Sequence, residues 1–488
     1  MILLKDVALL RTSAYIDGLW VDANDGCQFP VYNPANGTQV AKVSRAGLRE
    51  TQQAIDAAAR ALPNWRSRTA KDRATLMERW FELIMLHSED LATILTTEQG
   101  KPLEEARAEV SFGASFIKWF AEEGRRIYGD LIPSQNVGQR LLAMKQPVGV
   151  CGAITPWNFP VAMITRKVAP ALAAGCTIVV KPAEQTPLCA LALAELAQRA
   201  GIPPGVINVL PTDTSTSVEV GRLICESSVV RKLSFTGSTK VGRILMQQCA
   251  PTIKKLSLEL GGHAPFIVFA DADLDAAVAG AVISKYRNSG QTCVCTNRIY
   301  VHDSIYDAFV SKFAAAAAQL KLGNGLEAGV QQGPLIDEAA VKKVEQQVLD
   351  ATAKGARIVT GGKRSALGCH FYEPTVLAEV SHEMLIAHEE TFGPVAPVFR
   401  FHTDSEAVSL ANDSEYGLAA YFYSRDINRF WRVVEQLEYG MVGVNTGAMS
   451  NEVSPFGGIK QSGTGREGSK YGIDEYLEMK YVCVGGLS

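Results

Sequence analysis

The sequence lacks the segments that direct proteins into membranes or out of the cell. Its N-terminal stretch, MILLKDVALLRTSAYIDGLW, is interrupted by Lys5, Asp6 and Arg11, so it has neither the apolar core nor the cleavage site of a signal peptide. It is also not rich in Arg and Ser, as a mitochondrial presequence would be. The longest apolar run, VAPALAAGCTIVV, is shorter than the ~20 residues of a spanning helix. We therefore expect a soluble, cytoplasmic protein with no membrane partner.

Motifs for metal ions and nucleic acids are missing as well. The seven histidines form no HExxH motif, and His382 and His388 are spaced so that they do not share one helical face. A zinc site at Cys293 and Cys295 would need two more ligands, and no suitable cluster lies nearby in the sequence. The net charge of −3 gives no basic footprint for nucleic acid. We expect neither a metal site nor a nucleic-acid partner.

Cysteines are present, but they form no disulfide framework. The ten residues are scattered without regular spacing, which suits a reducing compartment. Within the stretch RNSGQTCVCTNR, Cys293 follows small polar residues that leave room for a substrate. From the residues alone, Cys293 is either a reactive thiolate or, as for most cysteines, a buried apolar sulfur.

Short apolar, β-branched runs alternate with helical patterns along most of the chain. VGVCGAIT (148–155), TIVVKP (177–182), GVINVLP (205–211) and RKLSFTG (231–237) are each followed by a helical segment. Such alternation indicates right-handed βαβ units and a largely parallel sheet. The stretch FTGSTKVGRIL suits a pyrophosphate at a helix N-terminus, although a plain βα turn explains it equally well.

Several stretches together resemble the aldehyde dehydrogenase superfamily. They occur in matching order along nearly the whole chain: TPWNFP (155–160), FTGS (235–238), LELGG (258–262), GQTC (290–293), EETFGPV (389–395) and PFGG (455–458). Longer stretches such as SNEVSPFGGIKQSG and GREGSKYGIDEYLE look most like the succinate-semialdehyde dehydrogenases. The resemblance implies oxidation of 4-oxobutanoate to succinate with NAD(P)⁺.

The resemblance implies an α/β fold with two Rossmann-like parallel-sheet domains and a small β oligomerisation element. The NAD(P)-binding domain would comprise residues 1–130 and 147–260, and the catalytic domain residues 261–445. The β-like segments 131–146 and 470–488 would form the oligomerisation element, by pairing with each other or with another subunit. We expect a homo-oligomer, either a dimer or a tetramer.

Three catalytic residues are implied by motif. Cys293 would attack the aldehyde carbon to form a thiohemiacetal, and the Asn158 side-chain amide would join the Cys293 backbone N–H in binding the oxyanion. After hydride transfer, Glu259 would act as the base that activates water for thioester hydrolysis. Without the family, Asn158 reads as a turn residue and Glu259 as a solvent-facing acid.

Cofactor contacts follow from the same motifs. The implied residues are Thr155, Pro156, Trp157, Lys181, Glu184, Gly237, Ser238, Glu390 and Phe392. Lys181 would reach the adenosine ribose, Gly237 and Ser238 the pyrophosphate, and Glu390 the nicotinamide ribose. Glu184 stands where many bacterial NADP-using relatives carry Ser. Its carboxylate would accept hydrogen bonds from the ribose hydroxyls and would repel a 2′-phosphate. We therefore predict NAD in preference to NADP, unless Glu184 is a surface acid that touches neither.

Substrate specificity is expected from groups that bind a distant carboxylate. Arg166, Arg287 and Ser450 are the candidates, because arginine donates two parallel hydrogen bonds to a carboxylate. Each arginine is otherwise read as part of a surface ion pair. Glutarate semialdehyde or another ω-oxo acid is a close alternative substrate, since one methylene changes discrimination by only ~1–3 kcal/mol.

Several alternatives stay open at the level of sequence. A thiol esterase using Cys293 and Glu259 is a different reaction class, although it leaves Lys181 and Glu184 without a role. Cys295 is either a passive second sulfur or the partner in a regulatory disulfide with Cys293. His263, where relatives often carry Asn or Lys, is read as a turn-stabilising residue rather than as a group that tunes Glu259.

Overall fold

Two large, mostly parallel sheets form the body of the protein. A computed structural model describes residues 2–487, so Met1 and Ser488, at the outer ends of the predicted segments, lie outside it. The first sheet has the order β2 (Leu19–Val21), β1 (Ala14–Ile16), β9 (Ile207–Val209), β8 (Thr177–Lys181), β7 (Val150–Ile154), β10 (Val230–Thr236), β11 (Lys255–Glu259) and β21 (Gly463–Thr464). The second has the order β14 (Arg357–Thr360), β15 (Thr375–Ala378), β16 (Val395–Phe401), β13 (Thr296–His302), β12 (Ala264–Val268), β18 (Ala419–Tyr423) and β19 (Met441–Val444).

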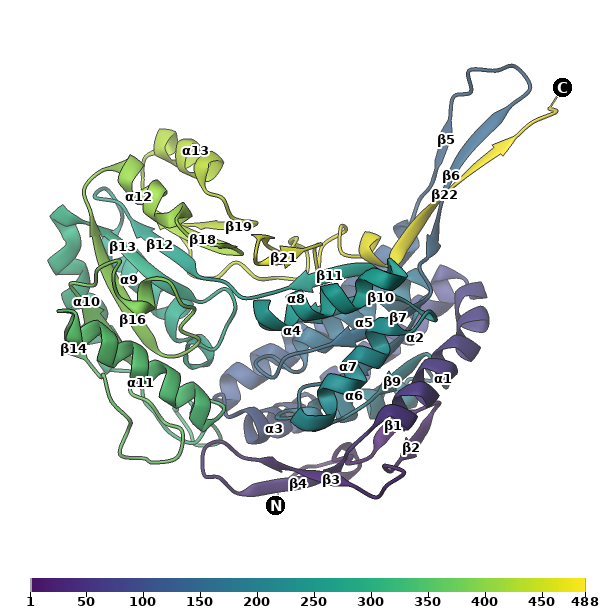
Figure 1. Cartoon of the computed structure of the whole chain (residues 1–488), viewed down its shortest axis with the longest axis horizontal. Coiled ribbons are helices and arrows are strands. Elements are labelled where there is room, and N and C mark those ends of the chain that lie inside the picture. The colour runs from purple at the N-terminus through teal and green to yellow at the C-terminus, as the bar shows by residue number, and fades with distance from the viewer. Residues whose placement is uncertain (1, 488) are drawn as a thin grey trace.

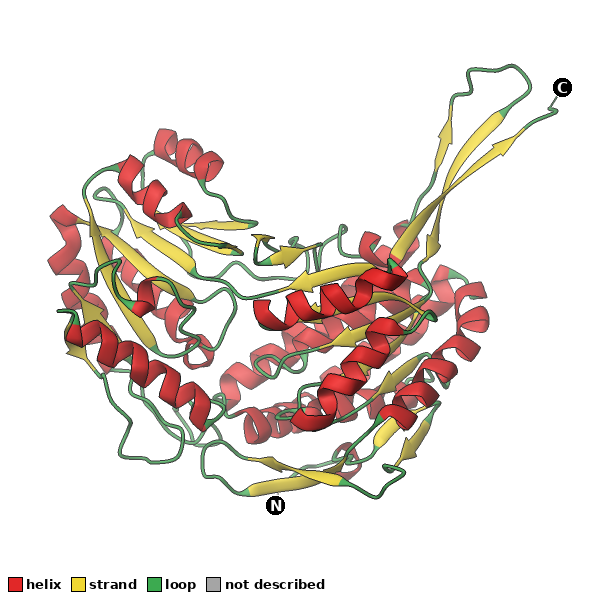
Figure 2. Ribbon diagram, viewed as in Figure 1, coloured by secondary structure: helices red, strands yellow, loops and turns green. Residues whose placement is uncertain are grey.

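Helices cover both faces of the sheets, as Figure 2 shows. They are α1 (Leu48–Ser67), α2 (Ala70–Leu86), α3 (Ser88–Gln99), α4 (Leu103–Glu123), α5 (Ala162–Ala174), α6 (Pro187–Arg199), α7 (Thr214–Glu226), α8 (Thr239–Cys249), α9 (Leu274–Tyr286), α10 (Tyr306–Ala318), α11 (Glu338–Ala353), α12 (Asp404–Asn412) and α13 (Ile427–Gln436). Because strands β7, β8 and β12 are buried along their whole length, their sequences are nearly continuous apolar runs. None of the helices within residues 2–487 is long and apolar enough to cross a membrane.

The strand order fixes where a ligand can bind. In chain order, the parallel core of the first sheet runs β7, β8, β9, β10, β11, but in space β10 lies beside β7. Successive connections therefore leave in opposite directions from β7 and β10, and a crevice forms outside the carboxyl ends of these two strands. Those ends lead directly into Thr155 and Gly237, which carry the predicted cofactor motifs. The chain passes from the first sheet to the second between Glu259 and Ala264.

A separate three-stranded sheet extends away from the body as an arm. It consists of β5 (Asp130–Ile132), β6 (Arg140–Pro147) and β22 (Leu477–Val484), and Figure 1 shows it projecting with the C-terminus near its tip. Antiparallel pairing runs from Leu477 opposite Pro147 to Val484 opposite Arg140. The two predicted β-like segments thus pair with each other within one chain.

Two small two-stranded sheets complete the structure. They are β3 (Gln28–Tyr32) with β4 (Gln39–Ser44), and β17 (Tyr416–Gly417) with β20 (Ile459–Lys460). The predicted α/β class with two parallel-rich sheets is confirmed. The functional names given to the two halves stay predictions.

Candidate active site

Cys293 lies in the loop between α9 and β13, at the wall of a cavity of about 260 Å³. The loop begins with a tight turn in which Asn288 and Ser289 have φ angles of +51° and +54°, an uncommon conformation for residues other than glycine. The Asn288 backbone N–H donates to Glu105 Oε2 at 2.8 Å, which anchors the turn to α4. The cavity is also lined by Trp157, Asn158, Gly237, Ser238, Glu390 and Phe392. The structure therefore brings residues from five of the six sequence motifs around one cavity.

The Asn158 side chain carries a free hydrogen-bond donor next to this thiol. Its Nδ2 donates one hydrogen to the Gln291 carbonyl oxygen at 3.0 Å. An amide nitrogen has a second hydrogen, and no acceptor for it lies within residues 2–487. The Cys293 backbone N–H is likewise without an acceptor in this part of the chain. Both donors are what an oxyanion would require, and the turn-residue interpretation of Asn158 does not explain a buried, half-used amide.

Burial raises the pKa of the Cys293 thiol to about 12, although the Arg166 guanidinium lowers it and Glu259 raises it further. The general expectation that a reactive cysteine has a lowered pKa is therefore not met. The reason is that the Arg166 and Arg287 cations do not offset the loss of hydration around a thiolate.

Glu259 ends β11 and is 3% exposed, so the solvent-facing interpretation is wrong. Neither carboxyl oxygen has a hydrogen-bond partner within residues 2–487. Burial, reinforced by the charge of Glu467, holds the pKa of Glu259 well above its usual range, while Lys167 and Arg166 act in the opposite direction. A carboxyl group with a raised pKa and free oxygens is suited to accepting a proton near neutral pH.

The pyrophosphate and nicotinamide-ribose candidates line the Cys293 cavity. Ser238 is the N-cap of α8, where its Oγ accepts from the Val241 N–H at 3.3 Å. Glu390 Oε1 accepts from the Gly262 N–H at 3.1 Å, so this carboxylate is held at the turn after β11. Phe392 has φ +51° and packs edge-on against Trp157, with ring centroids 5.5 Å apart. This unfavourable backbone angle for a bulky residue is typical of functional sites.

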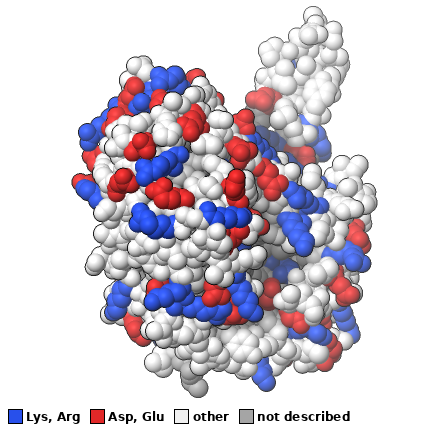
Figure 3. All heavy atoms as spheres, turned by 60° about the vertical axis from the view of Figure 1, so that its left-hand side comes forward, with Lys and Arg blue, Asp and Glu red and all other residues white. Residues whose placement is uncertain are grey.

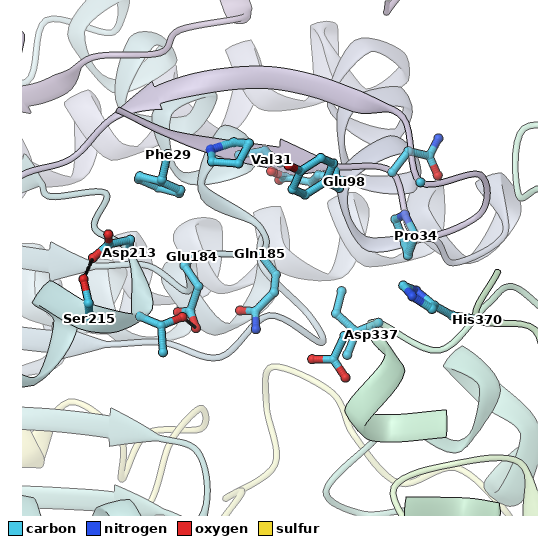
Figure 4. A pocket seen from close by; sticks show the side chains of 16 residues that line it. Phe29, Val31, Pro34, Glu98, Glu184, Gln185, Asp213, Ser215, Asp337 and His370 are labelled. Atoms are coloured by element: carbon cyan, nitrogen blue, oxygen red, sulfur yellow. Dashed lines mark hydrogen bonds between the residues drawn. The ribbon is translucent and has the colours of Figure 1, made fainter. Parts of the chain in front are cut away.

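Glu184 lies in a different, larger cavity of about 610 Å³. In Figure 4, Glu184, Asp213 and Ser215 lie on one side of that cavity, and Asp337 and His370 lie on the other. Glu184 Oε1 accepts from the Thr214 hydroxyl at 3.0 Å. Four acidic residues therefore line the same space: Glu98, Glu184, Asp213 and Asp337.

Thr155 and Lys181 line neither of these two cavities. The Lys181 ammonium is buried and donates to the Pro182 carbonyl at 3.1 Å, and the Thr155 N–H donates to the Lys181 carbonyl at 3.1 Å. Burial lowers the pKa of Lys181, and the Glu184 carboxylate opposes that change. The proximity of Glu184 nevertheless connects Lys181 to the larger cavity.

Two of the three substrate candidates lie together beside the neighbours of Cys293. Arg287 and Ser450 line one small recess together with Thr292 and Val294, the two neighbours of Cys293. The Arg287 guanidinium lies 5.1 Å from the centroid of the Phe159 ring and forms no salt bridge within residues 2–487.

Arg166 is more deeply placed than Arg287. It is 2% exposed, lies 4.2 Å from the centroid of the Phe456 ring, and has Nη1 3.6 Å from Glu467 Oε2. The surface-pair interpretation of Arg166 is therefore wrong, because its carboxylate neighbour is itself buried.

Cys295 and His263 have local roles in the structure. Cys295 is buried with its Sγ 3.5 Å from both the Lys285 and Thr296 carbonyl oxygens, and both cysteines of the pair are free thiols. His263 is also buried, and its Nε2–H donates to the Ala387 carbonyl at 2.9 Å. Burial holds the pKa of His263 well below its usual range, so the ring is neutral. Within residues 2–487 no group of three or more potential metal ligands is found.

Sequence reasoning missed several residues around the site. Lys343, on α11, lines the Cys293 cavity, but its position resembles that of any charged surface residue of a helix. Lys167 and Glu467 form a buried ion pair that lies far apart in sequence. Buried Lys101 donates to the Asn158 carbonyl at 2.8 Å. The sequence offers no signal for these contacts except that Lys101 follows the Gly100 helix end.

Comparisons with known proteins agree with the motifs. The Aldehyde dehydrogenase family model matches residues 20–482. Glutarate-semialdehyde dehydrogenase of Pseudomonas aeruginosa is 61% identical over 484 residues, covering 99% of this chain and 100% of the relative. The Escherichia coli K12 succinate-semialdehyde dehydrogenase, named for NADP(+), is 60% identical, covering 99% of each chain.

A solved structure gives the same result. The crystal structure of an E. coli NADP dependent enzyme has a TM-score of 0.98 and 60% identity, covering 99% of this chain and 100% of that chain. The predicted family resemblance is thereby confirmed over nearly the full length. The chain belongs to the aldehyde dehydrogenase family and is an NAD(P)-dependent oxidoreductase that acts on an ω-semialdehyde.

Proposed function

We propose that the protein oxidises succinate semialdehyde to succinate with NAD⁺. The observation that carries this proposal is the arrangement around Cys293: the thiol lines the 260 Å³ cavity with Asn158 and Glu390, and its neighbours Thr292 and Val294 line a recess with Arg287 and Ser450. A short aldehyde with a carboxylate at its far end would place its carbonyl at the thiol and its charge at Arg287. The relatives named for succinate and glutarate semialdehydes support this substrate class.

The chain's own residues supply the covalent steps. Cys293 Sγ bonds to the aldehyde carbon as its proton passes to solvent, while the Asn158 amide and the Cys293 N–H stabilise the oxyanion. A nicotinamide cofactor held by Gly237, Ser238 and Glu390 would supply the hydride acceptor that converts the adduct on Cys293 to a thioester. Glu259 then takes a proton from water as the hydroxyl attacks the thioester, and passes that proton to Cys293 Sγ as the C–S bond breaks and the acid product is released.

Arg287→Ala provides the test of the substrate. We expect the KM for succinate semialdehyde to rise at least tenfold, because the guanidinium no longer pairs with the substrate carboxylate. An uncharged aldehyde of similar length should keep its KM, and Arg425→Ala, which removes an exposed arginine of the surface, serves as the matched control. Equal losses for charged and uncharged aldehydes would contradict the assignment.

Glutarate semialdehyde is the second candidate, because two relatives at 61% and 60% identity carry that name. An extra methylene changes the binding free energy by only ~1–3 kcal/mol. Kinetic measurement is therefore needed to tell which of the two acids is preferred. Measuring kcat/KM across a series of ω-oxo acids would decide between them, and a higher value for the five-carbon acid would replace succinate semialdehyde. Ester cleavage without NAD⁺ at a comparable rate would instead favour a thiol esterase.

A further inference from the structure

Lys101 is a buried cation that the reaction described above does not use. Its ammonium pairs with Glu109 Oε2 at 2.5 Å, and it donates to the Asn158 carbonyl oxygen at 2.8 Å. It also lies 3.8 Å from the centroid of the Phe159 ring. Neither side chain of the ion pair is more than 1% exposed. The Lys101 ammonium is therefore bound to the segment that carries Asn158.

The turn that positions Lys101 requires glycine. Gly100 ends α3 with φ +99°, and a Cβ atom there would lie 2.8 Å from both Pro34 and Pro334. Any other residue would be strained and would clash, so the tight turn brings Lys101 inward before α4 begins. The backbone thus fixes the cation at the base of the site.

Glu109 extends the contact beyond Asn158. Its second oxygen, Oε1, accepts from the Val161 N–H at 2.9 Å and from the Ala162 N–H at 3.3 Å. These groups lie at the start of α5, three and four residues after Asn158. The ion pair thereby holds both ends of the segment 158–162 with hydrogen bonds to its main chain.

A second donor reaches the same carbonyl from the nucleophile loop. Asn288 Nδ2 donates to the Asn158 carbonyl at 3.0 Å, and Asn288 Oδ1 accepts from Gln99 Nε2 at 3.0 Å. Gln99 Oε1 in turn accepts from the Lys101 N–H at 2.9 Å. One network therefore connects the main chain of Asn158 with the loop that carries Cys293.

We propose that Lys101 is a positioning residue for the oxyanion donor: with Glu109 it holds the Asn158 main chain so that the free amide hydrogen faces the Cys293 carbonyl adduct. The inference rests on the proposed role of Asn158. A buried ion pair is weak support for stability, since apolar replacements of both partners are often tolerated. The contact of the Lys101–Glu109 pair with the Asn158 main chain is instead explained by a role in preorganising the Asn158 side-chain amide as a hydrogen-bond donor.

A double-mutant cycle tests the proposal. The first change is the paired variant Lys101→Met/Glu109→Gln, which leaves no unpaired buried charge and keeps an oxygen for Val161. The second is Asn158→Ala, which removes the side-chain amide but keeps the carbonyl that Lys101 binds. Stopped-flow measurement of NADH formation in the first turnover reports the acylation and hydride-transfer steps before thioester hydrolysis.

The paired variant should slow the first turnover about 10- to 100-fold, since losing an oxyanion donor altogether costs about 10²–10³. The KM for NAD⁺ should change less than twofold. In the Asn158→Ala background, the same pair of changes should slow the first turnover less than threefold. If the paired variant does not fold, Lys101→Arg carries the same expectations, because guanidinium does not fit a single-point ammonium site.

Equal losses in the two backgrounds, or no loss in the presence of Asn158, would overturn the positioning role. A wild-type first turnover in Asn158→Ala itself would instead contradict the proposed oxyanion chemistry. The two failures are therefore distinguishable.

Discussion

At the scale of single residues, burial sets the chemistry of the site. The Cys293 thiol is protonated at neutral pH in the unliganded chain, because its pKa is raised to about 12. Burial likewise raises the pKa of the Glu259 carboxyl group. On the proposed mechanism, we therefore expect the Cys293 thiol to ionise only as substrate and cofactor bind, and the resting thiol to react slowly.

The raised thiol pKa predicts slow, pH-dependent alkylation of Cys293. Only the thiolate reacts with iodoacetamide, so the rate in the cofactor-free enzyme should rise about tenfold for each pH unit between pH 7 and 10. The rate is measured by loss of activity and by mass spectrometry of the labelled peptide. Cys293→Ser is the control that accounts for labelling of exposed Cys369 and Cys483. A plateau below pH 9 would contradict the assignment.

Glu184 gives a prediction about the cofactor. With Asp213 it lines the larger cavity, so a 2′-phosphate there would face two carboxylates. Glu184→Ser should lower the KM for NADP⁺ at least tenfold and raise the KM for NAD⁺ severalfold, because repulsion and a ribose acceptor are both lost. The surface variant Glu219→Ser provides a control on nearby α7. Unchanged ratios of kcat/KM would show that Glu184 touches neither cofactor.

Motifs predicted the candidate site residues, but the burial and the neighbours of these residues depend on the tertiary structure. Cys293, Asn158, Glu390 and Phe392 were predicted from short motifs and lie around one cavity. The burial of Arg166 was not predictable, because its neighbour Glu467 is 301 positions away in the chain. Such long-range pairs leave no local pattern in a single sequence.

At the scale of secondary-structure elements, buried parallel strands were the most predictable. The runs around β7 and β8 are recognisable because strands covered on both faces are nearly continuously apolar. The antiparallel edge strand β21 was not, since it is two residues long and its pairing with β11 is set by tertiary contacts. Strand-like composition predicted that the two outer segments pair with each other or with another subunit, and the structure pairs β6 with β22 of the same chain.

The junction of α3 and α6 should make stability depend on pH. Both carboxyl oxygens of Glu98 accept from N–H groups at the start of α6, those of Leu188 and Cys189, at 2.8 Å. Burial raises the pKa of Glu98 to about 8, and the hydrogen bonds oppose that rise. In the folded chain Glu98 therefore stays protonated between about pH 4.5 and 8, whereas the unfolded chain ionises.

Because the unfolded state loses this proton first, the Glu98 contribution to stability should fall as pH rises through that window. Linkage allows up to about 1.4 kcal/mol per pH unit. Urea unfolding of wild type and Glu98→Gln at pH 5.5 and pH 8 measures the difference. The stability of wild type relative to the variant should decrease at the higher pH, and identical pH dependence would contradict the raised pKa.

At the scale of the whole molecule, the arm differs from the rest of the surface. Figure 3 shows acidic and basic side chains interspersed over the body, whereas the outer part of the arm is nearly free of both. Leu131, Met479 and Tyr481 on the arm are 71%, 68% and 62% exposed. Apolar side chains gathered on a projecting sheet are typical of an interface between subunits.

We therefore expect charged substitutions on the arm to reduce the size of the assembly. Met479→Asp with Tyr481→Asp should lower the mass measured by light scattering towards that of one chain, because both side chains would lose their apolar partner surface. Ile427→Asp, which changes an equally exposed apolar residue on α13, should leave the mass unchanged. A monomeric wild type, or an unchanged mass in the arm variant, would contradict the prediction.

The short strand β21 is made late in translation but pairs with a strand that is made much earlier. Its residues Gly463 and Thr464 pair with Glu259 and Leu258, so the outer edge of β11 is completed by a segment near the C-terminus. During translation, most of the first sheet emerges long before that segment does. In the nascent chain, the outer edge of β11 consequently stays unpaired until residues 463–464 have been synthesised. A product of premature termination would keep that strand edge exposed.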